Sequence, residues 1–349
     1  MDSTTEPTPA EDKVGVPRDV GDYQTGVSAA PKPAWKFWLG AVVRWAILAA
    51  LLLFLGRTLI DNYQKVCEQG ERPEVNWVLM IVALAGHTAG HYGFGVAWQR
   101  GLSALGGRVR LTTSVWLWSW TNLAKYLPVP GGKLVVPPIR AAAFATEGVS
   151  GALTICGLAL ESVCCILTGF AVFAITLPFQ AFTSEADSKY SWLCLLILPL
   201  LVLLHPRVFN GLTWVVLKVF RQEKAQFRLS LRDQVVVLGY WLVGWALMAG
   251  SFALLTASVT NLPLARAPLI AATFAFAWVL SMVSFITPAG IGVREIILGA
   301  LLVPQVGPIG GLLAGGSRLF TTAADGLSIL VAFTADQVAR IVRGPRTAR

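Results

Sequence analysis

Charged residues are scarce in this sequence. Asp, Glu, Lys and Arg together make up 13% of its 349 residues, whereas a soluble domain typically contains about 25%. Hydrophobic residues make up 55%, and the mean hydropathy is +0.64. A chain of this composition has too little polar surface for an ordinary soluble domain. It is typical of a polytopic integral membrane protein, and at roughly 20 residues per crossing its length holds about six to nine spans.

Motifs for soluble chemistry and for metal binding are absent. The sequence contains no nucleotide-binding loop, no GxSxG and no HExxH. Its five cysteines show no CxxC spacing, and four of them lie in apolar runs, where a thiol behaves as a small hydrophobe; they are Cys67, Cys156, Cys164, Cys165 and Cys194. We therefore expect no metal and no cofactor. The absence of a soluble catalytic domain favours a transporter over an enzyme.

The formal net charge of +9 does not indicate nucleic-acid binding, because the charges flank apolar runs and form no soluble basic patch. Residues 1–34 have neither a basic n-region nor an apolar core, so they do not form a cleavable signal peptide. Their Pro, Thr, Glu and Asp content predicts a disordered cytoplasmic tail. We expect a membrane domain at 35–340 and a basic cytoplasmic tail at 341–349.

Continuous apolar stretches divide the membrane domain. They lie at about 37–60, 77–98, 112–127, 151–177, 191–205, 233–258, 268–287 and 309–334. Most are long enough to cross about 30 Å of hydrocarbon at 1.5 Å rise per residue. Two of them, 112–127 and 268–287, run into Pro- and Gly-rich elements and are followed by short apolar segments. These two predict helices that break inside the membrane.

Charges in the loops predict the topology. The loops 99–111 and 205–232 and the C-terminal tail are basic, whereas 61–76 is rich in acids and 178–191 contains Glu185 and Asp187. The positive-inside rule places the basic segments, and both termini, in the cytoplasm of a cell-membrane protein. Segments 112–150 and 268–308 must then each enter and leave the membrane on the same face. The first segment uses the cytoplasmic face and the second the outer face.

This topology predicts an all-α fold with about six full spans and two re-entrant broken hairpins that form an inverted repeat. The first repeat covers about 77–177 and the second about 233–334. Interrupted helices in inverted repeats are the architecture of many transporters. The alternative is that each hairpin is a complete pair of spans, which leaves the net topology unchanged. The short second arms, 134–150 and 293–303, favour re-entrant segments.

The broken elements, 125–133 and 287–295, predict an anion site. Irregular backbone in hydrocarbon must face protein or a water-filled cavity, and the N–H groups where a helix begins attract phosphate. The candidate substrate-binding residues are Lys125, Gly131, Gly132, Lys133, Arg140, Gly290, Gly292, Arg294 and Arg318. Alternatively, the prolines and glycines end helices at the membrane surface, where the cations reach lipid headgroups.

Ionisable residues inside the spans are costly to insert and normally have partners. Glu161 lies near the centre of 151–177 and Asp325 near the centre of 309–334. With Glu295, they are candidates for balancing charge or carrying a proton. An Arg318–Asp325 pair that only holds helices together is the structural alternative. His87 and His91, one helical turn apart, indicate polar packing or proton handling rather than a metal site.

Three motifs resemble the lysylphosphatidylglycerol synthase transmembrane-region family: Lys-Tyr-Leu-Pro (125–128), Gly-Val-Ser (148–150) and Pro-Ala-Gly-Ile-Gly-Val-Arg-Glu (288–295). The resemblance covers roughly 37–340 and implies a flippase-like domain for lipids with anionic or sugar headgroups. The chain departs from the family pattern where Val129 and Pro130 precede Gly131, and where Pro137 and Pro138 precede Arg140.

The sequence therefore predicts flippase-like translocation of an anionic or phosphate-linked (glyco)lipid, with a membrane lipid as its partner. Two other classes stay open. One is a non-transporting scaffold for a glycosyltransferase or a lipid-synthesis enzyme. The other is an intramembrane enzyme, which would require Glu161, Asp325 and the two histidines to converge on one cavity.

Overall fold

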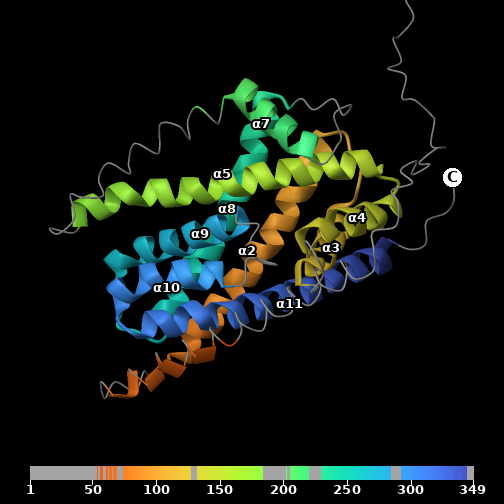
Figure 1. The fold of residues 1–349 in the computed structure, drawn as a ribbon. Helices are drawn as coiled ribbons and strands as arrows, with labels where there is room; N and C mark the ends of the chain where they lie inside the picture. Colours follow the sequence, from red (N-terminus) through yellow and green to blue (C-terminus); the bar gives the residue numbers. More distant parts are fainter. Residues whose placement is uncertain are drawn as a thin grey trace, which may run out of the picture. The chain divides into compact units, whose positions relative to one another are not determined.

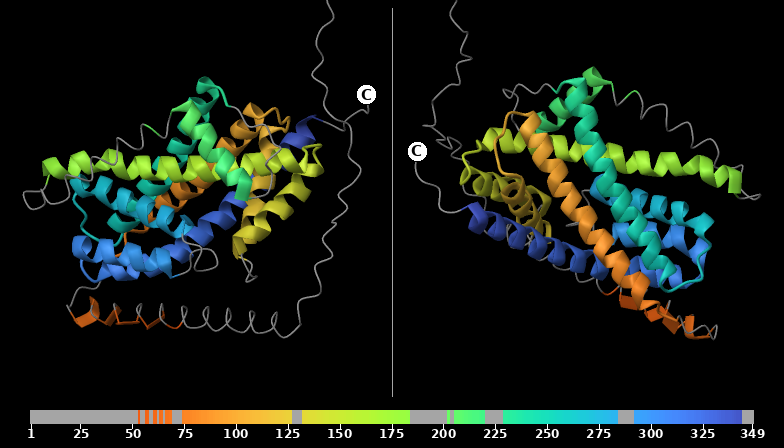
Figure 2. Two further views of the ribbon diagram at one scale, coloured as in Figure 1. Left: turned by 45° about the horizontal axis from the view of Figure 1, so that its top comes forward. Right: turned by 180° about the vertical axis from the view of Figure 1, so that it is seen from behind.

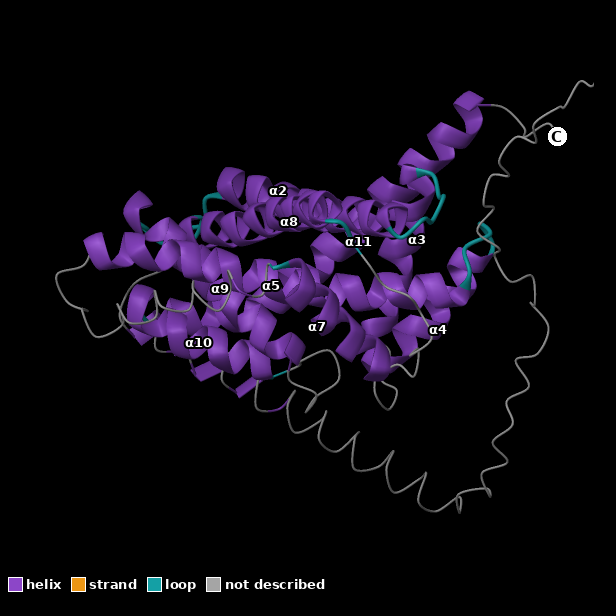
Figure 3. Ribbon diagram, turned by 90° about the horizontal axis from the view of Figure 1, so that it is seen from above, coloured by secondary structure: helices purple, strands orange, loops and turns teal. Residues whose placement is uncertain are grey.

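The computed structural model describes scattered positions between 53 and 68, and then residues 74–126, 132–183, 202, 205–219, 229–283 and 292–343. Every regular element in these ranges is a helix (Figures 1 and 3). The all-α prediction is confirmed for this part of the chain. The predicted N-terminal tail and the spans at 37–60 and 191–205 lie outside the residues that the structure describes in full.

The helices follow in an order that is nearly the same in the two halves. The first half contains α2 (Trp77–Ala104), α3 (Leu111–Thr121), the 3-10 helix η1 (Asn122–Tyr126), α4 (Gly132–Ala145) and α5 (Gly151–Thr183). After α7 (Pro206–Val219), the second half contains α8 (Leu231–Ala257), the 3-10 helix η3 (Leu264–Arg266), α9 (Ala267–Val283), α10 (Val293–Val306) and α11 (Ile309–Arg343). Each half is thus a long helix, a broken pair and a second long helix.

Three of these helices are long and apolar enough to cross a membrane. They are Gly151–Thr176 of α5, all of α8, and Ile309–Val342 of α11. The predicted span at 77–98 forms most of α2, which has 28 residues but does not belong to this group. The physical reason is its surroundings: α2 packs against α8, α3, α11 and α5, so it can carry histidines and glycines that a lipid-facing helix would not.

α2 and α8 run side by side (Figure 2). Glycines bring them close together, because a Cβ atom on Gly90 would lie only 3.0 Å from the Gly244 carbonyl oxygen and 2.6 Å from Met248 Cγ. Beside this contact, the Phe94 ring stacks on Trp241 with 4.7 Å between centroids. The close approach and the aromatic packing fix how the two halves meet.

The two broken pairs have short second helices. α4 and α10 contain 14 residues each, which is a rise of about 21 Å against about 30 Å of hydrocarbon. α4 packs against α3, and α10 packs against α9. Both Pro137 and Pro138 lie inside α4 without ending it. The breaks themselves, 127–131 and 284–291, lie outside the described residues.

Candidate functional site

Asp325 of α11 joins three elements near the first break. Its Oδ1 lies 2.9 Å from Nε2 of His91 in α2, and its Oδ2 lies 2.9 Å from Nζ of Lys125 in η1. The Asp325 side chain is 7% exposed, whereas that of Lys125 is 20% exposed. A carboxylate this deeply buried needs such partners, since an isolated charge in a low-dielectric interior is very costly.

A narrow cavity, too small to hold a water molecule, lies next to this triad. Its lining comes from α2, α3, η1 and α11: His91, Trp118, Ser119, Asn122, Leu123, Asp325 and Ser328. Ser119 is 4% exposed, and its hydroxyl has no hydrogen-bond partner among the described residues. The lining is therefore polar and not fully satisfied, which is unusual for a purely structural interior.

Arg140 and Glu161 form a second polar cluster. A guanidinium nitrogen of Arg140 in α4 pairs with Glu161 Oε2 in α5, and Trp118 Nε1 donates to Glu161 Oε1 at 3.0 Å. Arg140 Nε also donates to Thr121 Oγ1 at 3.1 Å, and its guanidinium lies 4.7 Å from the centroid of the Trp98 ring. Arg140 is 1% exposed. Both oxygens of Glu161 accept bonds, so this cluster is tightly satisfied.

A third cluster lies where α10 begins. Gly292 has φ +85°, a left-handed conformation that favours glycine, and its N–H donates to Glu295 Oε2 at 2.7 Å. Arg318 Nε of α11 lies 2.9 Å from Glu295 Oε1. Arg294 donates to the hydroxyl of Ser317 at 3.1 Å. Arg294 and Arg318 thus both lie within ion-pair distance of the Glu295 carboxylate at the start of α10.

His87 is fully buried in α2, one turn from His91, with 5.4 Å between the ring centroids. Phe274 and Phe320 approach its ring edge-on. Neither ring nitrogen has a well-aligned hydrogen-bond partner among the described residues, although the Met248 backbone is near. The imidazole is close enough to interact electrostatically with His91, Asp325 and Arg294. His87 thus lies beside the first cluster, one helical turn from His91.

The structure brings together most of the residues that the sequence singled out. Four cations and three carboxylates occupy the three clusters, a net charge of +1 among the described residues: Lys125, Arg140, Arg294 and Arg318 against Glu161, Glu295 and Asp325. Gly132 begins α4 and Gly292 precedes α10. Gly131, Gly290 and the Lys133 side chain lie outside the described residues.

Two details differ from the sequence-based expectation. The alternative Arg318–Asp325 pair along one face of α11 does not describe the geometry, because Arg318 reaches α10 and Asp325 reaches α2 and η1. Among the described residues, the narrow cavity beside Asp325 is lined by His91 but not by Glu161 or His87. Trp118 lies between Asp325 and Glu161: its ring lines the Asp325 cavity while its N–H binds Glu161.

Sequence reasoning missed the neutral partners of these charges. Trp118 is a buried hydrogen-bond donor. Thr121 and Ser317 contact the buried arginines. A second acid of α11 was also missed: Asp336 accepts from Thr113 at 2.7 Å and from Arg340 at 2.7 Å. Polar residues spaced on the buried face of an apolar helix were the available signal.

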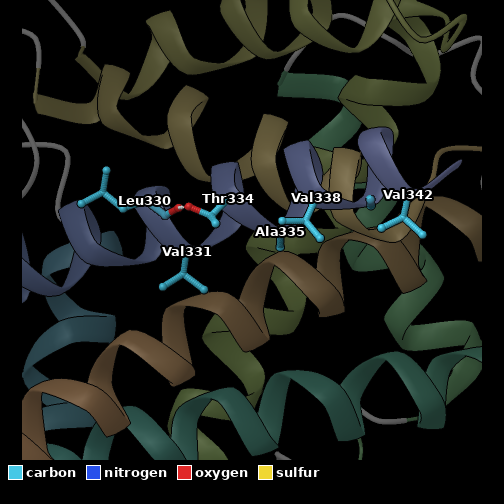
Figure 4. A pocket seen from close by; sticks show the side chains of 7 residues that line it. Leu330, Val331, Thr334, Ala335, Val338 and Val342 are labelled. Atoms are coloured by element: carbon cyan, nitrogen blue, oxygen red, sulfur yellow. Dashed lines mark hydrogen bonds between the residues drawn. The ribbon is translucent and has the colours of Figure 1, made fainter. Parts of the chain in front are cut away.

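The C-terminal part of α11 carries an exposed apolar groove, unlike the three charged clusters. Figure 4 shows an open groove lined by Leu330, Val331, Thr334, Ala335, Val338, Ala339 and Val342. The Thr334 hydroxyl donates to the Leu330 carbonyl of its own helix at 2.8 Å. No charged side chain lines the groove among the described residues. An apolar face of this kind suits contact with lipid chains rather than chemistry.

Comparisons with known proteins identify no family for the chain. No protein-family model matches it, and no curated protein is significantly similar to it. The geometry of the three clusters is therefore the basis for a functional proposal.

Proposed function

We propose that the protein is a flippase-like transporter that moves an anionic or phosphate-linked (glyco)lipid across the cell membrane. The observation that carries this proposal is the three charged clusters, with four cations against three carboxylates among the described residues, inside an otherwise apolar helical fold. Buried charge is costly in a membrane and marks substrate pathways. A net positive charge there favours a negative headgroup. The resemblance to the lysylphosphatidylglycerol synthase membrane domain supports the same substrate class.

The helix contacts support an inverted repeat as the basis of transport. If α2, α3, α4 and α5 are matched in order with α8, α9, α10 and α11, most of the contacts occur in equivalent pairs. α5 packs on α9 as α11 packs on α3, and α5 packs on α8 as α11 packs on α2. α4 contacts α5 as α10 contacts α11. We infer that the short second helices are arms of re-entrant hairpins in a multi-pass protein with cytoplasmic termini.

The two halves have equivalent ion pairs in which the positive and negative residues have swapped helices. In the first half, the short helix carries the cation Arg140 and the following long helix carries Glu161. In the second half, the short helix carries Glu295 and the long helix carries Arg318. Each pair ties a short helix to the long helix after it. We infer that these two pairs hold the arms in place, while Lys125 and Arg294 face the headgroup.

With Lys125 facing the headgroup, the lipid can reach the site from either face of the membrane in turn. Lys125 and Asp325 join the first half to the second, so a phosphate that takes the place of the carboxylate at Lys125 loosens that connection. Rocking of one half against the other then exposes the headgroup to the opposite face.

Substitution of Arg294 tests the site. In proteoliposomes with fluorescent phosphatidylglycerol, Arg294→Ala is expected to slow translocation by about 10- to 100-fold, since a hydrogen bond to a charged group contributes about 1.5–3 kcal/mol. The matched control is Arg100→Ala, because Arg100 is an exposed arginine of α2 that lies over Tyr240. Equal rates for both variants, with equal protein in the vesicles, would count against Arg294 as a substrate residue.

A non-transporting scaffold for a glycosyltransferase or lipid-synthesis enzyme is the second candidate. One observation favours it: each cation of the three clusters already has a carboxylate within ion-pair distance, as a static network would. Purified protein alone in vesicles separates the two, because only a transporter moves lipid without a partner.

A further inference from the structure

Among the acids of the three clusters, Asp325 is placed differently from Glu161 and Glu295. The two glutamates each bind an arginine together with a fixed N–H donor, Trp118 Nε1 or the Gly292 backbone. Arginine stays protonated in proteins. Asp325 instead has a histidine and a lysine among its partners, both of which can change charge. Asp325 also lines a polar cavity.

We propose that Asp325 is a proton-binding site that couples translocation to the pH gradient, with His91 exchanging its proton and Lys125 as the cation released for the headgroup. This inference deepens the proposed function and rests on it. A proton that enters from water binds the carboxylate and forms the neutral acid. Lys125 keeps its charge, so the triad changes from net 0 to net +1. The same change follows if the proton resides on His91.

This increase of one positive charge is what a phosphate headgroup requires. Protonation therefore raises the affinity for the anionic lipid, and by linkage the lipid raises the affinity for the proton. Proton and lipid then move in the same direction. For one proton per monoanionic headgroup the transported complex is neutral, so the membrane potential has no direct effect on it.

Several other charged groups lie on the helices that carry or contact Asp325, and they affect how readily it binds a proton. From α2 the titratable groups are His91 and His87, and from η1 the group is Lys125. α10 contributes Arg294 and Glu295, and α11 itself contributes Arg318. α3 has no titratable side chain in its sequence. His87 is fully buried next to His91, so this desolvated imidazole is not assigned the proton.

The test uses vesicles of phosphatidylcholine that contain NBD-labelled phosphatidylglycerol, with the full-length protein reconstituted. Dithionite reports how the label divides between the leaflets, and trapped pyranine reports proton movement. With wild type, a gradient of one pH unit should concentrate the label up to about tenfold in the leaflet facing the less acidic side. Proton uptake should accompany the lipid.

Asp325→Asn should distribute the label evenly whatever the gradient. His91→Gln, which keeps the Lys125–Asp325 pair, should slow coupled movement and remains informative if Asp325→Asn does not fold. The matched control is Asp336→Asn, because Asp336 is a buried acid of the same helix bonded to Thr113 and Arg340. This control should keep the pH coupling.

The outcomes separate the two proposals. Wild type that moves no labelled lipid at any pH would refute the proposed function. Lipid movement without any response to the gradient would overturn the proton site and leave the flippase function standing. Coupling retained in Asp325→Asn, or lost equally in Asp336→Asn, would also overturn it.

Discussion

The Arg140–Glu161 pair allows the sharpest test of what holds the first broken pair to α5. Arg140 is 1% exposed, and Glu161 accepts from both Arg140 and Trp118. Arg140→Met leaves the Glu161 carboxylate, 13% exposed, with only the indole donor, and Glu161→Gln leaves a buried guanidinium without a counter-charge. Removing one partner of a buried pair costs about 3–5 kcal/mol, because the remaining charge stays uncompensated.

The double variant Arg140→Met/Glu161→Gln should recover most of this loss. No uncompensated charge remains, the glutamine oxygen still accepts from Trp118, and Thr121 keeps its bonds to the backbone of Leu117 and Trp118. We expect the double variant to be more stable than either single variant, with a coupling free energy of about 3 kcal/mol or more.

Unfolding in mixed micelles of a mild detergent and SDS, followed by fluorescence of the 13 tryptophans, measures the four free energies of this cycle. A Trp118→Phe background serves as a control, since it removes the indole donor from all four proteins. Single variants that each cost less than about 1 kcal/mol, or a double variant equal to the sum of the singles, would refute the view that the pair compensates two buried charges.

Two further predictions concern packing and thiol access. Gly90→Ala should destabilise the fold measurably, because its Cβ would lie 2.6 Å from Met248 Cγ. The control Gly239→Ala has open space around it and should be neutral or slightly stabilising. Equal stabilities of the two variants would contradict the close α2–α8 contact. In a Cys194→Ser background, a maleimide should label Cys67 alone without denaturant, since Cys67 is exposed and Cys156, Cys164 and Cys165 are buried. Mass spectrometry gives the number of labelled thiols. Labelling of the buried thiols in folded protein would contradict the packing.

Composition and hydropathy alone indicated an all-helical membrane-type protein, and Pro and Gly positions predicted breaks at 125–133 and 287–295, between the described helices η1 and α4 and between α9 and α10. These features are local: apolar length and the conformational limits of Pro and Gly act within a few turns of chain. The candidate charges were also visible in the sequence, because an ionisable residue in an apolar run is costly wherever it lies.

Only the tertiary structure decided which charge meets which. Helical spacing suggested Arg318 and Asp325 as a pair, yet Arg318 reaches Glu295, 23 residues earlier, and Asp325 reaches His91, more than 200 residues earlier. Such partners depend on how α11 packs against α10 and α2, which no local pattern encodes. The roles of Trp118 and Thr121 likewise come from packing, since an indole N–H or a hydroxyl binds whatever acceptor or donor the neighbouring helix places beside it.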